Sequence, residues 1–379
     1  MIIGGGLTGC TIACVFATAG VSVAVLERDR IGRGMGAVCS LGLLRQEPDA
    51  DFQDVVQTHG VRAARHVWQD TRRASLDFAA TLRRLSVRCD LDSQDAVWFA
   101  RDRDAEKTLQ RSLKARREAG VGQDGASWLS GAAFRRETAI VALGGIKTRD
   151  VSQVDPYRAV VGLARAAEAR KALIFERSTA GRVRAGRRQV EVTTDGVTVV
   201  ADQVVIATGY PPAEFRALRR HFSRTHSYLV QTDSLPASVR REVGRRAAML
   251  RDTHEPPHFL RWAPEDRVIF AGGDQPAVPD RARARTLVQR TGQLMYELSV
   301  LYPSISGIRP VSGLDAEYSR TRDGLPVFGP HRNYPRHLFA LGHGRHGAGL
   351  AYLAARILLR NYLGRPDRGD AWFSFARIL

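Results

Sequence analysis

The first nine residues place strong limits on how this chain can fold. They read Met-Ile-Ile-Gly-Gly-Gly-Leu-Thr-Gly and contain the pattern Gly4-x-Gly6-x-x-Gly9. An apolar stub precedes the glycines, a helical stretch follows over residues 10–19, and an apolar run then ends at Glu27. Strand, glycine turn, helix, strand and acid in this order form a dinucleotide-binding βαβ unit. The sequence therefore predicts a Rossmann-like α/β fold at its start.

Each glycine of the pattern has its own physical reason. Gly4 permits a tight turn, Gly6 lets the backbone approach a pyrophosphate, and Gly9 lets the helix lie close to the sheet. The helix N-terminus offers unpaired N–H groups and partial positive charge to phosphates. Glu27 stands near the spacing of an acid that accepts hydrogen bonds from ribose hydroxyls. The alternative to cofactor binding is a purely structural glycine turn.

Length and cysteine usage narrow the class of protein. A chain of 379 residues with 44% hydrophobic and 25% charged residues is large enough for two packed units of an ordinary soluble protein. No apolar run is long enough to span a bilayer and no leader peptide is evident, so we expect a cytoplasmic protein. The absence of a CxxC pair favours buried thiols over disulfides or a metal site. The cysteines are Cys10, Cys14, Cys39 and Cys89.

The net charge of +18 raises the alternative of a nucleic-acid-binding protein. The basic residues are mostly arginines, spread from Arg28 to Arg377 and often beside acids, as in residues 101–104. The sequence shows no basic stripe interleaved with aromatic residues. We therefore expect no specific nucleic-acid partner and only a weak affinity for anionic surfaces.

Apolar periodicity predicts a chain that mixes helices and strands. Helical spacing covers residues 51–86 and 101–119, and a helix that starts at Asp155-Pro156 is expected to run to about residue 170. Further helices are expected near 280–300 and 350–363. Strands are expected at 96–100, 172–175, 190–193, 197–200, 204–210, 228–231, 258–262, 268–271 and 338–341.

A second glycine-rich junction between a strand and a helix lies near the C-terminus, at residues 342–349. The chain thus begins and ends with backbone suited to a cofactor. This implies a cofactor-binding domain assembled from distant segments, with another domain inserted between them. We predict a cofactor-binding domain of residues 1–85, 150–212 and 311–379, and an α+β substrate-binding domain of residues 86–149 and 213–310, built on a mixed or antiparallel sheet.

Four motifs follow one another along the chain: the glycine pattern with Glu27, the small-residue loop 32–42, the strand end 206–209, and the C-terminal pair 323–329 and 342–347. Together they resemble the FAD-dependent oxidoreductases of the D-amino-acid oxidase superfamily, which holds glycine oxidase and sarcosine oxidase. The resemblance runs the full length and implies a glutathione-reductase-type FAD-binding fold with non-covalent FAD. The contacts that it implies come from Gly4, Gly6, Leu7, Thr8, Gly9, Glu27, Arg28, Ser40, Thr208, Gly209, Gly342, Gly344, His346 and Gly347.

The chain departs from the family pattern in two places. The first strand has only Met1–Ile3 before the glycines, so we expect weaker FAD retention and lower stability than in a chain whose strand is extended. The loop beside the flavin carries Met35, Gly36 and Cys39 where the family has adjacent serine or threonine, which leaves Ser40.

The resemblance implies oxidation of a C–N bond in a small amino acid or related amine, with a hydride passing to flavin N5 and electrons then to oxygen or another acceptor. No acid–base pair is strictly needed, but the protein must orient the substrate and hold its charged end. His346 falls where sarcosine-oxidase-like relatives place a flavin-side lysine; the alternative is a structural turn histidine. A FAD-dependent 2-hydroxy-acid dehydrogenase and a FAD-binding subunit with little oxidase activity both stay open.

Three further residues are candidates for the substrate site, and we expect the substrate to carry a carboxylate. Arg45 follows the flavin loop, where some relatives place a carboxylate-binding arginine, and its fork of donors suits that group. Arg261 lies on an expected strand of the inserted domain, and Tyr228 lies on a strand placed to cap the cavity. Each has a structural alternative, as a solvated arginine or a core tyrosine. We expect no metal site, because two prolines interrupt the interval between His254 and His258.

Overall fold

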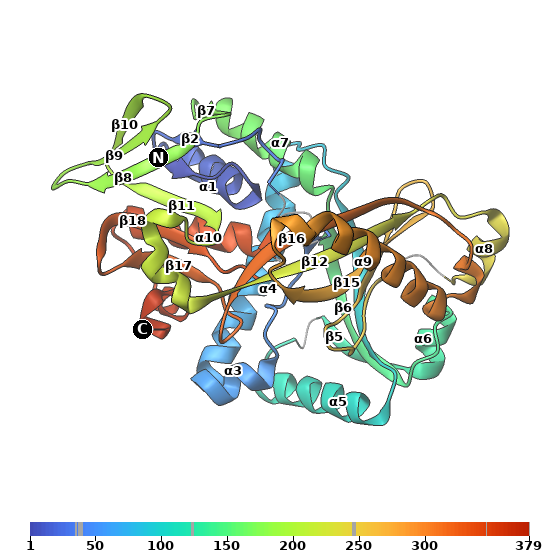
Figure 1. Cartoon of the computed structure of the whole chain (residues 1–379). Helices are drawn as coiled ribbons and strands as arrows, with labels where there is room; N and C mark the ends of the chain where they lie inside the picture. The colour runs from blue at the N-terminus through green and yellow to red at the C-terminus, as the bar shows by residue number, and fades with distance from the viewer. Residues whose placement is uncertain (35, 37–40, 123–124, 245–247, 346, 379) are drawn as a thin grey trace.

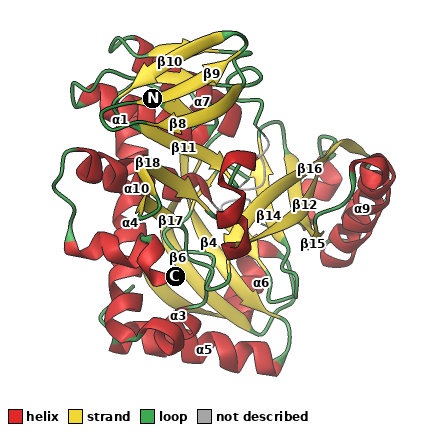
Figure 2. Ribbon diagram, turned by 60° about the vertical axis from the view of Figure 1, so that its left-hand side comes forward, coloured by secondary structure: helices red, strands yellow, loops and turns green. Residues whose placement is uncertain are grey.

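The computed structural model describes residues 1–34, 36, 41–122, 125–244, 248–345 and 347–378. Two large sheets organise the chain, one of six strands and one of nine, and a three-stranded sheet lies beside the first (Figure 1, Figure 2). Among the described residues, no helix combines the length and the apolarity needed to cross a membrane.

The six-stranded sheet is the predicted Rossmann-like core. Its outermost pair is antiparallel and its other pairs are parallel. In the first strand, Ile2 faces the helical side of the sheet and Ile3 the opposite side, as strand alternation requires. In spatial order the strands are β17 (Val327–His331), β18 (Tyr334–Leu341), β11 (Val204–Gly209), β1 (Ile2–Ile3), β2 (Ala24–Leu26) and β7 (Leu173–Phe175).

Helices cover one face of this sheet and a small antiparallel sheet covers the other. The expected helix start at Asp155-Pro156 is confirmed, because the Asp155 side chain accepts from the Arg158 N–H at 2.9 Å. The helical face comprises α1 (Leu7–Thr18), α3 (Phe52–His59), α4 (Val61–Arg84), α7 (Pro156–Glu168) and α10 (Gly347–Tyr362). The opposite face carries β8 (Ala180–Ala185), β9 (Val190–Thr194) and β10 (Val197–Ala201).

The nine-stranded sheet confirms the inserted α+β part on a mixed sheet. The pair β13–β4 is parallel, and the other pairs are antiparallel. In spatial order the strands are β16 (Pro310–Thr321), β12 (Phe222–Thr232), β15 (Arg267–Pro276), β14 (Phe259–Ala263), β13 (Ala248–Arg251), β4 (Asp92–Ala100), β6 (Gly144–Gln153) and β3 (Leu43–Leu44), with β5 (Ala126–Ser130) also paired to β6. Its helices are α5 (Arg103–Glu118), α6 (Gly131–Thr138), α8 (Ala237–Glu242) and α9 (Asp280–Leu301).

The two faces of the nine-stranded sheet differ in what they contact. Tyr228 and Val230 point into a core that includes Leu294 and Leu298 of α9. Their neighbour Leu229 points to the opposite face, where it joins a smaller apolar cluster. The members of this second cluster are Leu41, Leu43, Val151, Leu229, Met249, Phe259 and Ala271.

Three short segments cross the domain boundaries expected from the sequence. Residues 43–44, 150–153 and 311–321 pair within the nine-stranded sheet, although the sequence grouped them with the cofactor-binding segments. The division of the chain into two domains stays a prediction. Sheet membership favours shifting these segments to the inserted part.

Several elements differ from the sequence-based expectation. The helical stretch over 51–86 is divided into α3 and α4 at Gly60, whose φ is 84°. The strand β16 was not foreseen, because it is an edge strand with few buried apolar side chains. Buried free thiols are confirmed for Cys10, Cys14 and Cys89, while Cys39 lies outside the described residues.

Candidate functional site

The N-terminal glycine turn is closed at two positions and open at a third. Gly4 has a φ of 107°, and a Cβ there would lie 2.7 Å from the Ala207 carbonyl oxygen. A Cβ on Gly9 would lie 1.8 Å from the Gly4 carbonyl oxygen. A Cβ on Gly6 would meet nothing within 4 Å. The turn therefore needs its outer glycines for packing and keeps an open approach over the middle one.

The N-terminus of α1 is suited to an anion. Gly6 is its N-cap residue and supplies no side-chain hydrogen bond, and the first turn holds no acidic residue. The first N–H groups of the helix consequently keep their donors and their partial positive charge for a ligand. Leu7 is buried in the core beneath this turn, whereas Thr8 is only partly buried.

Glu27 lies at the end of β2 and contacts the glycine turn. Its Oε2 accepts from the Gly5 N–H at 2.6 Å, and its Oε1 accepts from the Asp29 N–H at 2.9 Å. These bonds fix the carboxylate beside the turn, as the βαβ pattern predicts. The neighbouring Arg28 is exposed.

The end of β11 is joined to the C-terminal glycine junction. The Gly209 carbonyl oxygen accepts from the Gly342 N–H at 3.0 Å and from the Ser319 hydroxyl at 2.6 Å. Thr208 is exposed, and its hydroxyl donates to the Tyr210 carbonyl oxygen at 2.8 Å. Gly209 and Gly342, which belong to motifs that the sequence analysis named separately, thus lie together.

The C-terminal junction also reaches the start of α1. Nε2 of His343 lies 3.4 Å from the Thr8 hydroxyl oxygen. Burial lowers the pKa of His343 to about 4, so its ring is neutral at pH 7. Gly347 begins α10, and a Cβ on it would lie 2.7 Å from the His343 Cβ. His346 and Ser40, both named from the sequence, lie outside the described residues.

A buried arginine that the sequence analysis did not single out lies in the same junction. Arg345 is 3% exposed, and its guanidinium pairs with the Asp274 carboxylate, which also accepts from the Tyr318 hydroxyl at 2.7 Å. The Cζ atom of Arg345 is 4.9 Å from the ring centre of Phe259. Its buried Nη1 has no hydrogen-bond partner among the described residues. An unpaired guanidinium donor in a buried position is suited to an anion.

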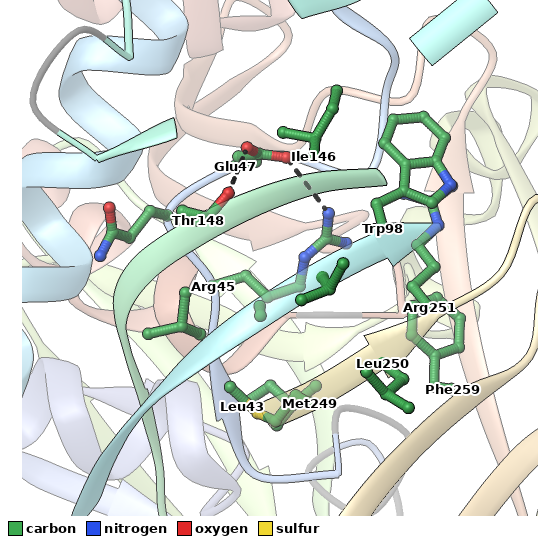
Figure 3. Close-up of a pocket in the computed structure, with 14 residues that line it drawn as sticks. Leu43, Arg45, Glu47, Trp98, Ile146, Thr148, Met249, Leu250, Arg251 and Phe259 are labelled. Atoms are coloured by element: carbon green, nitrogen blue, oxygen red, sulfur yellow. Dashed lines mark hydrogen bonds and ion pairs between the residues drawn. The ribbon is translucent and has the colours of Figure 1, made fainter. Parts of the chain in front are cut away.

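Next to Phe259, a pocket opens on the face of the nine-stranded sheet that carries the smaller apolar cluster (Figure 3). Arg45 and Glu47 enter it from the segment after β3, and Arg251 enters from β13. The remaining walls are mostly apolar. Its lining residues are Leu43, Arg45, Gln46, Glu47, Ala96, Val97, Trp98, Ile146, Thr148, Val151, Met249, Leu250, Arg251 and Phe259.

Glu47 does not provide a free negative charge in this pocket. Its Oε1 accepts from Nη1 of the buried Arg116 at 2.6 Å and from the Thr148 hydroxyl at 3.3 Å. Burial alone would raise the pKa of Glu47, but Arg116 and Arg45 outweigh it and lower that pKa. The carboxylate is therefore ionised and neutralised by its partners.

The structure separates the three substrate-site candidates named from the sequence. Arg45 lines the pocket, with Nη1 3.4 Å from Asp49 Oδ1. Arg261 lies on β14 two residues from Phe259, and its Nη1 donates to the Gln153 side chain at 3.3 Å. Tyr228 is buried in the α9 core, on the opposite face of the sheet from the pocket. This placement does not favour contact between Tyr228 and a substrate.

These features agree with a comparison of the sequence with protein families. The model of the family described as "FAD dependent oxidoreductase" matches residues 1–360. The chain belongs to this family. It is therefore a FAD-dependent oxidoreductase, as the four motifs predicted.

Relatives and solved structures of FAD-dependent oxidoreductases match nearly the whole chain. A probable oxidoreductase, OrdL, of Haemophilus influenzae is 22% identical, with 97% of this chain and 83% of the relative covered. The gamma-glutamylputrescine oxidoreductase of Escherichia coli is 22% identical, with 98% and 85% covered. The crystal structure of glycine oxidase from Geobacillus kaustophilus superposes with a TM-score of 0.79 at 20% identity, covering 98% of this chain and 96% of the other. The structural likeness confirms the fold.

The residues around the glycine turn fit FAD. The open space over Gly6 and the uncapped N-terminus of α1 would hold the pyrophosphate, and Glu27 would accept from ribose hydroxyls. Gly209 and Gly342, which are hydrogen-bonded to each other, would lie along the flavin side with His343. Bound FAD supplies the hydride acceptor of the reaction.

Sequence reasoning missed the polar residues that surround the pocket. Arg345 lies within the motif of residues 342–347, where the histidines and glycines gave the stronger sequence signal. Asp274 and Arg251 carried no sequence signal, since one acid and one arginine among many are not distinctive. A search for arginines inside glycine-rich junctions would have found Arg345.

Proposed function

We propose that the protein oxidises a C–N bond of a small amino acid or related amine that carries a carboxylate. The names of its relatives support this class, since one is a gamma-glutamylputrescine oxidoreductase and one solved structure is a glycine oxidase. The electrons pass from the reduced flavin to oxygen or another acceptor.

One observation carries the proposal. Arg345 lies in the junction whose His343 contacts Thr8 at the start of α1, and its Nη1 is a buried donor without a partner among the described residues. A substrate carboxylate would supply the acceptor that Nη1 lacks. Asp274 holds the other side of the guanidinium, so the fork is fixed before the substrate arrives.

The remaining walls of the pocket have distinct roles in this proposal. Phe259 and Met249 exclude water from the reacting carbon, and Arg45 adds positive charge at the pocket wall. Arg261 remains a second candidate anchor. His346 stays a candidate for a flavin-side role, and Tyr228 contributes through packing of the sheet.

Two subsidiary proposals concern the cofactor and the compartment. FAD binds without a covalent link, so acid or heat should release intact FAD. The protein works in the reducing cytoplasm, which the buried free thiols of Cys10, Cys14 and Cys89 support.

The test is anaerobic bleaching of the FAD-loaded protein with amino acids, N-methyl amino acids and 2-hydroxy acids. Amino acids or N-methyl amino acids should bleach the flavin, and ammonia or an amine should appear with the oxidised product. Bleaching by 2-hydroxy acids alone would instead identify a hydroxy-acid dehydrogenase. Failure of all three classes would contradict the proposal. Peroxide formed on adding oxygen would distinguish an oxidase from an enzyme that uses another acceptor.

A further inference from the structure

The arginines that line the pocket or contact its lining residues differ in whether they have a carboxylate partner. Arg116 pairs with Glu47 at 2.6 Å, and Arg345 pairs with Asp274. Arg45 lies 3.4 Å from Asp49, so it also has a carboxylate neighbour. Each of these three guanidinium groups therefore has a carboxylate partner within the protein.

Arg251 is the exception at this pocket. Among the residues that the structure describes, its side chain forms neither a hydrogen bond nor an ion pair, and its buried Nε has no partner. Its Cζ lies 4.1 Å from the ring centre of Trp98 and 5.7 Å from that of Phe259 (Figure 3). The guanidinium thus contacts two aromatic rings at the pocket wall, and these contacts leave its N–H donors available.

We propose that Arg251 binds a second anionic group of the substrate, so that the enzyme acts on amines or amino acids carrying two carboxylates. This inference rests on the function proposed above and narrows its substrate class. Arg345 takes the carboxylate next to the reacting carbon, and Arg251 takes the distal one.

The ring of Phe259 brings both arginines within reach of one small molecule. The Cζ atoms of Arg345 and Arg251 lie 4.9 Å and 5.7 Å from the centre of the same ring, that of Phe259. The charges also favour a dianion over a substrate with a distal amine. Burial, and then Arg45, lower the pKa of Arg251 to about 10 although the carboxylates of Asp49, Glu47 and Asp51 act in the opposite direction, so it is still a cation at pH 7. A distal ammonium group would meet this cation, whereas a carboxylate would neutralise it.

The experiment compares pairs of ligands that differ in the distal charge, on the FAD-loaded protein without oxygen. The pairs are aspartate with asparagine, glutamate with glutamine, and iminodiacetate with N-ethylglycine, using both enantiomers where they exist. Affinity is read from the change in flavin absorbance on binding, and turnover from the rate of bleaching. In at least one pair, the diacid should bind about tenfold or more tightly than its neutral counterpart.

Arg251→Met should abolish this preference, because methionine keeps an apolar stem against Trp98 but has no charge. Arg251→Lys should restore part of it, since the charge returns without the fork. Arg188→Met removes the same charge from an exposed position after β8 and should leave the preference at its wild-type value. Thermal melting of each variant confirms that it is folded.

The possible results separate the two proposals. Lack of preference in every pair, or a preference that survives in Arg251→Met, overturns the role of Arg251 even where monocarboxylates bleach the flavin. If no compound bleaches the flavin but diacids bind with an Arg251-dependent preference, the inferred anion site holds and the proposed oxidation fails.

Discussion

The backbone N–H of Arg345 donates to Oδ2 of Asp49 at 2.6 Å, although the two residues are 296 positions apart. The same carboxylate oxygen lies where a side chain at position 344 would begin, 2.1 Å from an ideal Cβ on Gly344. Glycine at 344 therefore permits the bond. This hydrogen bond joins the segment after β3, which carries Arg45, to the junction that carries Arg345.

Loss of this bond should lower stability and weaken the substrate site together. We expect Asp49→Ala to reduce the free energy of unfolding by about 1–3 kcal/mol, because a buried backbone donor loses its acceptor. Urea unfolding measures the change, and Glu191→Ala on the exposed side of β9 is the control, with little expected effect. An Asp49→Ala protein as stable as wild type would show that the bond contributes nothing.

Replacement by alanine should affect stability at one glycine of the first turn and FAD binding at another. Gly9→Ala forces a methyl group against the Gly4 carbonyl oxygen and should destabilise the protein even without FAD. Gly6→Ala has a compatible φ of −75° and open space, so the FAD-free protein should melt near the wild-type temperature. Its methyl group would occupy the approach of the pyrophosphate, so FAD affinity should fall. Undiminished FAD binding by Gly6→Ala would contradict this position for the cofactor.

Glu27→Ala should weaken FAD binding by roughly 1–3 kcal/mol, because ribose hydroxyls would lose their acceptor. Glu27→Gln should lose less, since its amide oxygen still accepts. Titration of the FAD-free protein with FAD, followed by flavin fluorescence, gives both dissociation constants. Equal constants for Glu27→Ala and wild type would place the ribose elsewhere.

Arg345→Met should raise the KM for the carboxylate substrate well over tenfold while FAD stays bound, since truncating a buried charged anchor costs on the order of 2–5 kcal/mol. The variant also removes the guanidinium partner of Asp274, so a loss of stability has to be separated from a loss of substrate binding. Adding Asp274→Asn should recover part of the melting temperature but not the KM. Arg45→Ala and Arg261→Ala serve as comparisons, and a larger KM effect in either would identify it as the main anchor.

The ring of His258 should make stability depend on pH. It lies 2.7 Å from Asp252 and 3.1 Å from Glu297, and these carboxylates outweigh burial and raise its pKa above 6.5. Because the folded state binds this proton more tightly, its stabilising effect is complete below pH 6.5 and is lost as pH rises through the folded pKa. Melting temperatures of wild type and His258→Gln should therefore differ most at acidic pH and converge at alkaline pH. A difference that is constant with pH would show that His258 does not titrate in this way.

The sequence was sufficient for the cofactor-binding half because its signals are local. The glycine spacing, the flanking apolar runs and the position of Glu27 predict one βαβ unit, and the structure has β1, α1 and β2 in that order. The N-cap at Asp155 is equally local, since the side chain bonds to a backbone group three residues away. Such features follow from the geometry of a few adjacent residues.

Edge strands and strand faces were harder to foresee. Alternation along β12 predicts that Tyr228 and Leu229 point to opposite faces, but it does not say which of the two faces a helix covers. The packing of α9 decides this, because it covers the face that carries Tyr228. Leu229 packs on the other face, in the cluster that includes Phe259 and Met249.

The sequence by itself determined the cofactor family, the βαβ unit and the mixed α/β class. Only the tertiary structure decided which groups meet: Arg345 with Asp274, Glu47 with Arg116, and Arg251 with the rings of Trp98 and Phe259. The reason is physical, since ion pairs between distant segments depend on how sheets and helices pack. An arginine in isolation carries no mark of its partner, so its pairing is set only when the chain is folded.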